Sequence, residues 1–135
     1  MALENQGQVY SWGSGQGGRL GHGDEIGENA PKEIVFLRDK KVKIIEAGEC
    51  TSGCITWKNE IMLWGVGLHG RLGTGETSNV YEPTYIEDLK DQKVEDLCLG
   101  STHTLCLLRN GKGMCWGASK YGKLGLEACL DRNFT

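Results

Sequence analysis

Two glycine patterns in the sequence have the spacing of a phosphate-binding loop. Gly13-x-Gly15-x-x-Gly18 and Gly65-x-Gly67-x-x-Gly70 both match the dinucleotide-binding fingerprint, in which glycines let the backbone approach a pyrophosphate. That chemistry also needs a helix directly after the loop, so that its N-terminus faces the phosphates. Polar residues and a proline follow each pattern instead. We therefore expect these glycines to allow positive φ in loops, and we expect no bound cofactor.

The cysteines and histidines lack the spacing of a metal or catalytic site. The six cysteines contain no Cys-x-x-Cys pair, and no histidine lies at ligand spacing from a cysteine pair. Their neighbours are largely apolar, so we expect free thiols that pack as small hydrophobic side chains, as at Cys54 and Cys106. Serine-hydrolase, P-loop and zinc-protease motifs are also missing. The sequence predicts no metal site, no catalytic residue and no enzymatic activity.

The overall composition is that of a folded, mildly acidic and glycine-rich domain. The chain has 135 residues, 21 glycines and a formal net charge of −3. This acidity argues against direct nucleic-acid binding, which usually needs a basic patch. No apolar run could cross a membrane, and the N-terminus does not resemble a secretory signal, so we expect a cytoplasmic or nuclear protein. Dense glycine favours short strands joined by tight turns.

The tryptophans and many of the glycines recur with a period of 52 residues. The dipeptide Trp-Gly occurs at residues 12–13, 64–65 and 116–117, and a Gly-Arg/Lys-Leu-Gly segment occurs at residues 18–21, 70–73 and 122–125. No gap is needed, and chance does not keep such a register over this length. We therefore divide the chain, as a single partial domain of residues 1–135, into units of approximately 9–60 and 61–112 and a truncated third unit, 113–135.

Each unit is predicted to supply about four short antiparallel strands. In the second unit, strands are expected before Trp64-Gly65 and at residues 93–100 and 104–108, and Asn110-Gly111 is a strong hairpin signal. The matching turn of the first unit, Lys58-Asn59-Glu60, keeps an asparagine but lacks the glycine. Four-stranded sheets with two apolar faces bury both by radial stacking. We predict an all-β fold, an incomplete β-propeller with two full four-stranded blades and the start of a third.

One motif of the repeat is specific enough to indicate a family. The pattern Trp-Gly-x-Gly-x-x-Gly-Arg-Leu-Gly, with Gly-x-x-His-Thr in the preceding strand, resembles the regulator of chromosome condensation repeat from about residue 9 to residue 127. Proteins of that family form seven-bladed propellers. Because only two full periods are present, the resemblance implies a fragment or a subunit whose propeller is completed by another chain.

The resemblance also implies candidate partner contacts. In the family, the loop after the equivalent glycine lies on a propeller face, and in founding members its acidic and histidine side chains contact a small GTPase. The matching candidates are Glu49, Ser101, Thr102 and His103. Many members keep the histidine without exchange activity, so a hydrogen-bonded loop histidine is the alternative. Trp57, which aligns with Arg109, is a further candidate contact, with local packing as its alternative.

The predicted function is a protein-interaction or scaffold module whose face loops contact a protein partner. The alternative is a guanine-nucleotide exchange factor, or part of one, for a Ran-type small GTPase. A third interpretation is the substrate-recognition part of a larger ubiquitin ligase. The expected partner is a protein, either a small GTPase or another chain that completes the propeller, and neither nucleic acid nor membrane is expected.

The remaining repeated residues are expected to be structural. The tryptophans should pack between blades, and the cation of each Gly-Arg/Lys-Leu-Gly segment should bond carbonyl or carboxylate groups of the adjacent blade, although a basic row for a partner is the alternative. These structural positions are Trp12, Gly13, Gly18, Arg19, Leu20, Gly21, Trp64, Gly65, Gly70, Arg71, Leu72, Gly73, Trp116, Gly117, Gly122, Lys123, Leu124 and Gly125.

Overall fold

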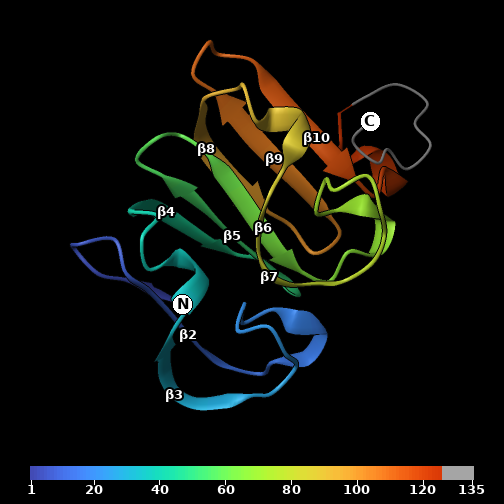
Figure 1. Ribbon diagram of the computed structural model, residues 1–135. Coiled ribbons are helices and arrows are strands. Elements are labelled where there is room, and N and C mark those ends of the chain that lie inside the picture. The colour runs from blue at the N-terminus through green and yellow to red at the C-terminus, as the bar shows by residue number, and fades with distance from the viewer. Residues whose placement is uncertain (126–135) are drawn as a thin grey trace.

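The computed structural model describes residues 1–125, which form three antiparallel β-sheets that follow one another along the chain (Figure 1). The first sheet contains β1 (Ala2–Leu3), β2 (Val9–Gly13) and β3 (Glu28–Glu33). The second contains β4 (Val42–Ala47), β5 (Thr51–Thr56), β6 (Ile61–Gly65) and β7 (Val80–Tyr85). The third contains β8 (Val94–Leu99), β9 (His103–Leu108) and β10 (Gly113–Gly117).

The predicted all-β, incomplete propeller is confirmed, because the sheets stack side by side and do not close into a ring (Figure 1). Short 3₁₀ helices lie in the connections: η1 (Gln16–Gly18), η2 (Val35–Leu37), η3 (Leu68–Gly70), η4 (Glu87–Leu89) and η5 (Lys120–Gly122). Within residues 1–125 no helix is long and apolar enough to cross a membrane.

The sheets contain three, four and three strands, because they are out of phase with the sequence units. The second sheet takes β4 and β5 from residues 9–60 and takes β6 and β7 from residues 61–112. A counterpart of β4 in the first sheet would precede residue 1, and a counterpart of β7 in the third would begin at residue 132, outside the described residues. The 52-residue period therefore determines the order in which strands recur along the chain. Hydrogen-bond pairing determines which four consecutive strands form one sheet.

The glycine after each repeated tryptophan has a conformational reason. Gly13, Gly65 and Gly117 have φ angles of 101°, 108° and 100°, which side chains with a Cβ rarely adopt. A Cβ on Gly65 would also lie 2.5 Å from the carbonyl oxygen of Cys50. The pairing of β6 with β7 shifts register between Leu63 and Gly65, and β2 with β3 shifts between Ser11 and Gly13. The Trp-Gly dipeptide thus marks a repeated bulge at the end of a strand.

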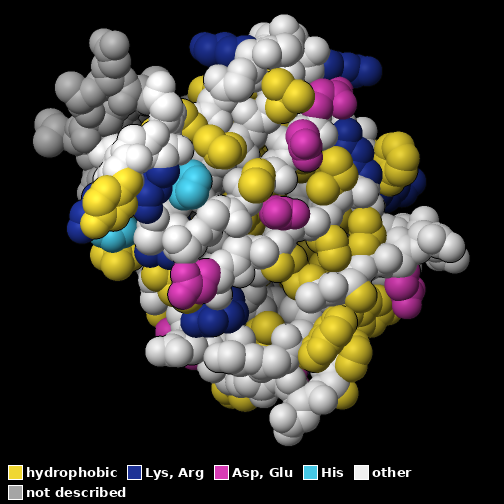
Figure 2. Space-filling model, turned by 180° about the vertical axis from the view of Figure 1, so that it is seen from behind, with side chains coloured by type: hydrophobic (Ala, Val, Ile, Leu, Met, Phe, Trp, Pro, Cys, Tyr) yellow, Lys and Arg dark blue, Asp and Glu magenta, His cyan; other side chains and the backbone are white. Residues whose placement is uncertain are grey.

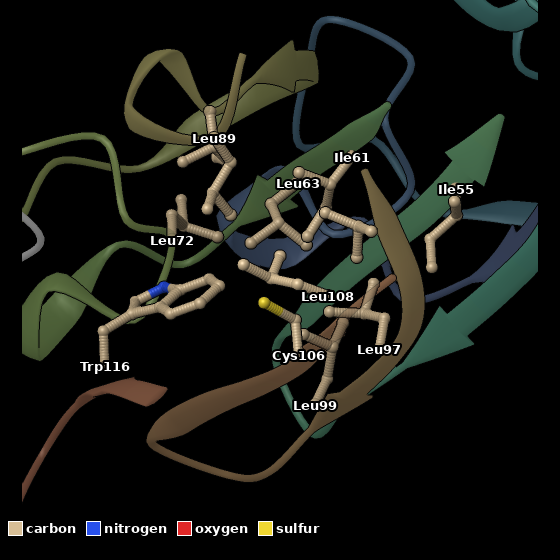
Figure 3. Close-up of a cluster of buried hydrophobic side chains, with 12 residues drawn as sticks. Ile55, Ile61, Leu63, Leu72, Leu89, Leu97, Leu99, Cys106, Leu108 and Trp116 are labelled. Carbon is tan, nitrogen blue, oxygen red and sulfur yellow. The ribbon is translucent and has the colours of Figure 1, made fainter. Parts of the chain in front are cut away.

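The hydrophobic core lies between consecutive sheets. Between the second and third sheets, Ile55, Leu63 and Leu72 pack against Leu97 and Trp116 in the larger cluster (Figure 3). Between the first and second sheets, a smaller cluster is formed by residues from both sides: Val9, Ile34, Leu37, Val42, Cys54, Met62 and Trp64. The second sheet therefore buries both of its faces against its neighbours, as in a propeller, whereas Leu105 and Leu107 of the third sheet are 38% and 44% exposed.

The cysteines that the structure describes are free thiols, and two of them lie in these clusters. Burial raises the pKa of Cys54 to about 12 and that of Cys106 to about 11. Both therefore remain protonated at neutral pH and pack as small apolar side chains. Cys129 lies outside the described residues.

The turn between β5 and β6 shows how an asparagine can replace a glycine. Asn59 has a φ of 63°, and Gly111, which stands 52 residues later between β9 and β10, has a φ of 84°. Asparagine tolerates this left-handed conformation better than most residues with a side chain. The hairpin is therefore kept without the Asn-Gly pair, and the Asn59 side chain also accepts a hydrogen bond from Lys43.

Candidate functional site

A repeated set of hydrogen bonds joins each sheet to the next. We call the contact between the first and second sheets seam 1, and that between the second and third sheets seam 2. In seam 1, the carbonyl oxygen of Arg19 accepts hydrogen bonds from the Ser52 hydroxyl at 2.8 Å and the Trp64 indole at 3.2 Å. In seam 2, the carbonyl oxygen of Arg71 accepts from the Thr104 hydroxyl at 2.7 Å and the Trp116 indole at 3.0 Å. Each indole is thus fixed to the loop of the preceding sheet.

The arginine side chains cross the same seams in the other direction. The Arg71 guanidinium donates to the carbonyl of Leu68 at 2.8 Å and to the carbonyl of Ser101 in the next sheet. Arg19 donates in the same way to the carbonyls of Gln16 at 2.8 Å and Glu49 at 3.2 Å. Arg71 is only 5% exposed, and burial lowers its pKa. Each guanidinium group therefore ties its own loop to a loop of the next sheet by donating hydrogen bonds to backbone carbonyls in both.

The loop between β8 and β9 is held from both sides. The Ala118 amide donates to the Thr102 carbonyl at 2.9 Å, and the Lys123 ammonium donates to the Thr102 hydroxyl at 2.9 Å. Within the loop, the Gly100 amide donates to the His103 carbonyl at 2.9 Å. The backbone is consequently rigid, and Ser101 projects from it with an exposed side chain. A rigid frame that presents an exposed loop is a common basis of recognition.

His103 is partly buried beneath this loop. A Cβ on Gly100 would lie 2.4 Å from the His103 ring, so the glycine leaves room for the imidazole. The Nδ1 atom is buried and has no hydrogen-bond partner among the described residues. Burial, followed by the nearby Lys123 charge, lowers the pKa of His103. The ring is therefore mainly neutral at pH 7 and only partly exposed, next to Gly100.

The other predicted contacts lie elsewhere. Glu49 is exposed on the loop between β4 and β5, which is the equivalent of the Ser101 loop in the preceding sheet. Trp57 is 71% exposed, but it follows the far end of β5. A six-residue strand spans about 20 Å, so Trp57 and Glu49 lie at opposite ends of the sheet. The structure therefore groups Ser101, Thr102 and His103 in one loop, with Glu49 in its counterpart and Trp57 apart from both.

The expectation that Trp12 packs between blades is wrong for this chain. Trp12 is 42% exposed, whereas Trp64 and Trp116 are completely buried. The Trp64 and Trp116 indoles each donate a hydrogen bond to a carbonyl 45 residues earlier, in the loop of the preceding sheet. The burial of this repeated tryptophan depends on a preceding sheet, which the sequence position alone does not provide.

Sequence reasoning missed the exposed residues at the tips of η3 and η5. Leu68 is 53% exposed and Tyr121 is 89% exposed, next to His69 and Lys120 respectively. The matching residues in η1 are Gln16 and Gly17. The sequence contained a sign of these exposed residues, because Leu68 stands where the first unit has Gln16, and Tyr121 stands where it has Gly17. No group of three or more possible metal ligands is found among residues 1–125.

The sequence model for the Regulator of chromosome condensation (RCC1) repeat matches residues 6–55 and 59–107. The chain belongs to the RCC1 repeat family. The two matched segments contain Arg19 and Arg71, while Trp116 of seam 2 lies beyond them.

Relatives share this region within much longer proteins. The chain is 38% identical over 127 residues to the human E3 ubiquitin-protein ligase HERC2, covering 93% of this chain and 3% of HERC2. It is 34% identical over 125 residues to the Arabidopsis thaliana ultraviolet-B receptor UVR8, covering 93% of this chain and 28% of UVR8. This chain thus spans less than a third of the length of either relative.

The fold also matches a solved propeller. Prp20p from Saccharomyces cerevisiae superposes with a TM-score of 0.86 at 22% identity, and the match covers 98% of this chain and 34% of Prp20p. That structure was described together with the binding of Prp20p to Gsp1p and histones. At this identity the likeness supports the fold alone.

Proposed function

We propose that this RCC1 repeat chain is a protein-interaction module that binds its partner through the loops at seam 2. The observation that carries the proposal is the loop between β8 and β9, whose backbone is held by Arg71 and Ala118 while Ser101 remains exposed. A loop that is ordered before binding loses little conformational entropy on association, which favours affinity.

The relatives support a binding role over a specific chemistry. HERC2 is a ubiquitin ligase and UVR8 is a light receptor, yet both contain the region that matches this chain. A shared region in proteins of such different activity is consistent with a scaffold that presents different loops. Similarity to HERC2 also supports a recognition role within a larger ligase, although the match covers only 3% of HERC2.

Affinity capture with matched variants tests the proposal. Ser101→Arg changes the exposed loop without removing a side-chain hydrogen bond to any of residues 1–125. Asp91→Arg places the same side chain on an exposed turn away from seam 2. We expect proteins captured by the wild type to be lost with Ser101→Arg and kept with Asp91→Arg. Equal capture by both variants, with unchanged melting temperatures, would contradict a binding role for this loop.

Guanine-nucleotide exchange on a Ran-type small GTPase is the second candidate. Exposed Glu49 on the equivalent loop of seam 1 supports it, because the family resemblance implies that acidic side chains of such loops contact a small GTPase. An exchange factor should accelerate release of labelled nucleotide from the GTPase, and Glu49→Ala or His103→Ala should slow that release. Because the His103 ring is only partly exposed, we expect Glu49→Ala to have the larger effect. A rate identical to spontaneous release would rule out this candidate. Localisation in the cytoplasm or nucleus stays a prediction that imaging of the tagged protein tests.

A further inference from the structure

Each seam contains a socket that receives the tryptophan of the following sheet. At seam 1 the socket consists of the carbonyl of Arg19, which accepts a hydrogen bond from the Trp64 indole, and of Gly21. A Cβ on Gly21 would lie 2.7 Å from the indole nitrogen of Trp64. The glycine therefore leaves room for the ring, while the carbonyl fixes its N–H group. Seam 2 has the same arrangement, with a corresponding Cβ distance of 2.8 Å, in Arg71, Gly73 and Trp116.

A third socket of the same shape lies at residues 123–125. Lys123 has φ and ψ angles of −63° and −15°, close to the −60° and −17° of Arg71. The φ of Gly125 is 66°, close to the 68° of Gly73. A Cβ on Gly125, in contrast, would have no atom of residues 1–125 within 4 Å. The loop therefore has the backbone shape that accepts an indole, and none of the described residues fills it.

Trp12 is the repeated tryptophan that remains exposed, on the other end of the stack of sheets. Val9, in the same strand β2, packs in the cluster between the first and second sheets. Because side chains alternate along a strand, Tyr10 and Trp12 point away from the second sheet. Trp64 points from the second sheet in the same sense, toward the sheet that precedes it. Figure 2 shows hydrophobic side chains exposed over the first sheet, at the lower right of the view.

The third sheet has an apolar face that the second sheet does not cover. Cys106 and Leu108 of β9 pack toward the second sheet. Leu105 and Leu107 alternate with them and therefore point to the opposite face, where both are exposed. A shallow cavity of about 190 Å³ is lined in part by these two leucines. The side chains of the three strands that share this face form what we call the outer face: Cys98, Leu105, Leu107 and Cys115.

The equivalent face of the second sheet is buried against a neighbouring sheet. Ile55, which stands 52 residues before Leu107, is completely buried in the cluster between the second and third sheets. One equivalent position differs in size, because Gly53 stands 52 residues before Leu105. A Cβ on Gly53 would lie 2.8 Å from the Leu97 side chain of β8. Leu105 therefore fits best against a sheet that has no strand at the position of β8. The first sheet, as described in residues 1–125, consists of β1, β2 and β3 and has no strand there.

We propose that two copies of this chain associate head to tail, with the first sheet of one copy packed on the outer face of the other. Trp12 of one copy enters the socket formed by Lys123 and Gly125 of the other, and its indole donates to the Lys123 carbonyl. The second copy thereby provides the preceding sheet that Trp12 lacks within its own chain.

Two copies can make this contact twice. Together they have six sheets, which lies within the range of about 4–8 blades found in propellers. A head-to-tail contact that closes into a ring gives a discrete assembly rather than an open filament, so we expect a closed pair. This inference goes beyond the proposed interaction function, because it concerns the end faces of the sheet stack rather than the Ser101 loop.

Light scattering of the 135-residue chain over a range of concentrations tests the pairing. The wild type should have twice the monomer mass, and Trp12→Ala should raise the dissociation constant of the pair at least about tenfold, because it removes a central aromatic contact. Trp57→Ala is the matched control, since it removes an indole that is exposed at the far end of β5, and it should leave the constant unchanged. Leu107→Glu should also weaken the pair, whereas Leu68→Glu changes an exposed leucine of η3 and should not.

Mixing two variants distinguishes a head-to-tail contact from one in which identical faces meet. Trp12→Ala keeps an intact outer face, and Leu107→Glu keeps an intact Trp12. An equimolar mixture should therefore recover mixed pairs, detected by native mass spectrometry, at concentrations where neither variant pairs with itself. Reaction of the exposed Cys98 thiol with a maleimide is a second measurement that does not depend on the folding of Leu107→Glu. At high concentration Cys98 should react more slowly in the wild type than in Trp12→Ala, although the two residues lie on different sheets.

Each other outcome overturns the inference. A wild-type chain that is monomeric at every soluble concentration would exclude the pair. Pairs that survive Trp12→Ala, equal losses in Trp12→Ala and Trp57→Ala, or equal Cys98 reaction rates in the wild type and Trp12→Ala would exclude the socket contact. A mixture of folded variants that recovers no pairs would assign the association to identical faces. Circular dichroism of dilute Trp12→Ala should match the wild type, because the ring is exposed within one copy.

Discussion

Seam 1 and seam 2 have nearly the same interior and different surfaces. In both, an indole and a hydroxyl bond one arginine carbonyl, and the arginine side chain bonds the loop of the next sheet. At the surface the loops differ: η1 carries Gln16 and buried Gly17, whereas η3 and η5 carry exposed Leu68 and exposed Tyr121. The interior is constrained by packing and by buried hydrogen bonds, while the exposed tips are free to vary. The comparison teaches that the repeat fixes the buried residues of a seam and leaves the exposed loop residues free to differ.

The strongest test of the shared interior is removal of a seam tryptophan. We expect Trp64→Ala and Trp116→Ala each to lower the free energy of unfolding by about 3–5 kcal/mol, because each deletes a completely buried ring. Trp12→Ala should have a much smaller effect, since Trp12 is 42% exposed. Urea denaturation of the three variants measures the difference. Equal destabilisation by Trp12→Ala would show that exposure does not explain the role of this position.

Replacing each seam arginine by alanine should lower the stability by an amount that depends on how deeply its hydrogen bonds are buried. Arg71→Ala should destabilise the protein by about 1–3 kcal/mol, since it leaves two carbonyls without their charged donor. Arg19→Ala should cost less, because its hydrogen bonds are exposed to solvent. Arg71→Lys, which copies Lys123, serves as the control and should fall between the wild type and alanine. Equal melting temperatures for Arg71→Ala and the wild type would refute a structural role for this cation.

The hydroxyl groups provide a finer test of equivalence. Thr104→Val and Ser52→Ala each remove one donor to an arginine carbonyl, while the indole bond to the same oxygen remains. Each change should therefore cost about 0.5–1.5 kcal/mol, with similar values in the two seams. Thermal denaturation of both variants is the measurement. A large effect in only one seam would break the equivalence that the geometry indicates.

The smallest expected effects concern the pH dependence of stability. Burial is the largest cause that lowers the pKa of both His22, near seam 1, and His103, in seam 2, from the ordinary value of 6.5. The unfolded chain therefore binds protons more readily, and stability should fall as the pH drops from 6.5 through the lower folded-state pKa values. His22→Gln and His103→Gln should each flatten this slope in urea melts at several pH values. Unchanged slopes in both variants would argue against buried neutral histidines.

Several parts of the fold followed from particular residues. The repeated Trp-Gly pairs predicted strand ends, and the structure shows bulges there because the glycines adopt positive φ. The Asn110-Gly111 signal predicted the hairpin between β9 and β10, which pair antiparallel. The turn at Asn59 was harder to predict, since the asparagine occupies the glycine position rather than the one before it.

The candidate site was predicted only in part. Ser101, Thr102 and His103 could be located because the family resemblance marks the residues that follow the repeated glycine, here Gly100. Its contacts with Arg71 and Lys123 join residues 30 and 21 positions apart, and such separations are not visible in a local pattern. The tip residues were overlooked because exposure of Leu68 and Tyr121 depends on how neighbouring sheets pack.

The amino-acid sequence by itself determined the period, the strand and turn types, and the residues of the repeated seam. These features arise from local preferences: glycine permits positive φ, apolar alternation favours strands, and identical segments repeat identical geometry. Only the tertiary structure decided which strands share a sheet, and it buried Trp64 and Trp116 while leaving Trp12 exposed. The physical reason is that burial and strand pairing depend on contacts between neighbouring units. The sequence of a single repeat therefore cannot determine which of its side chains are buried or which strands share its sheet.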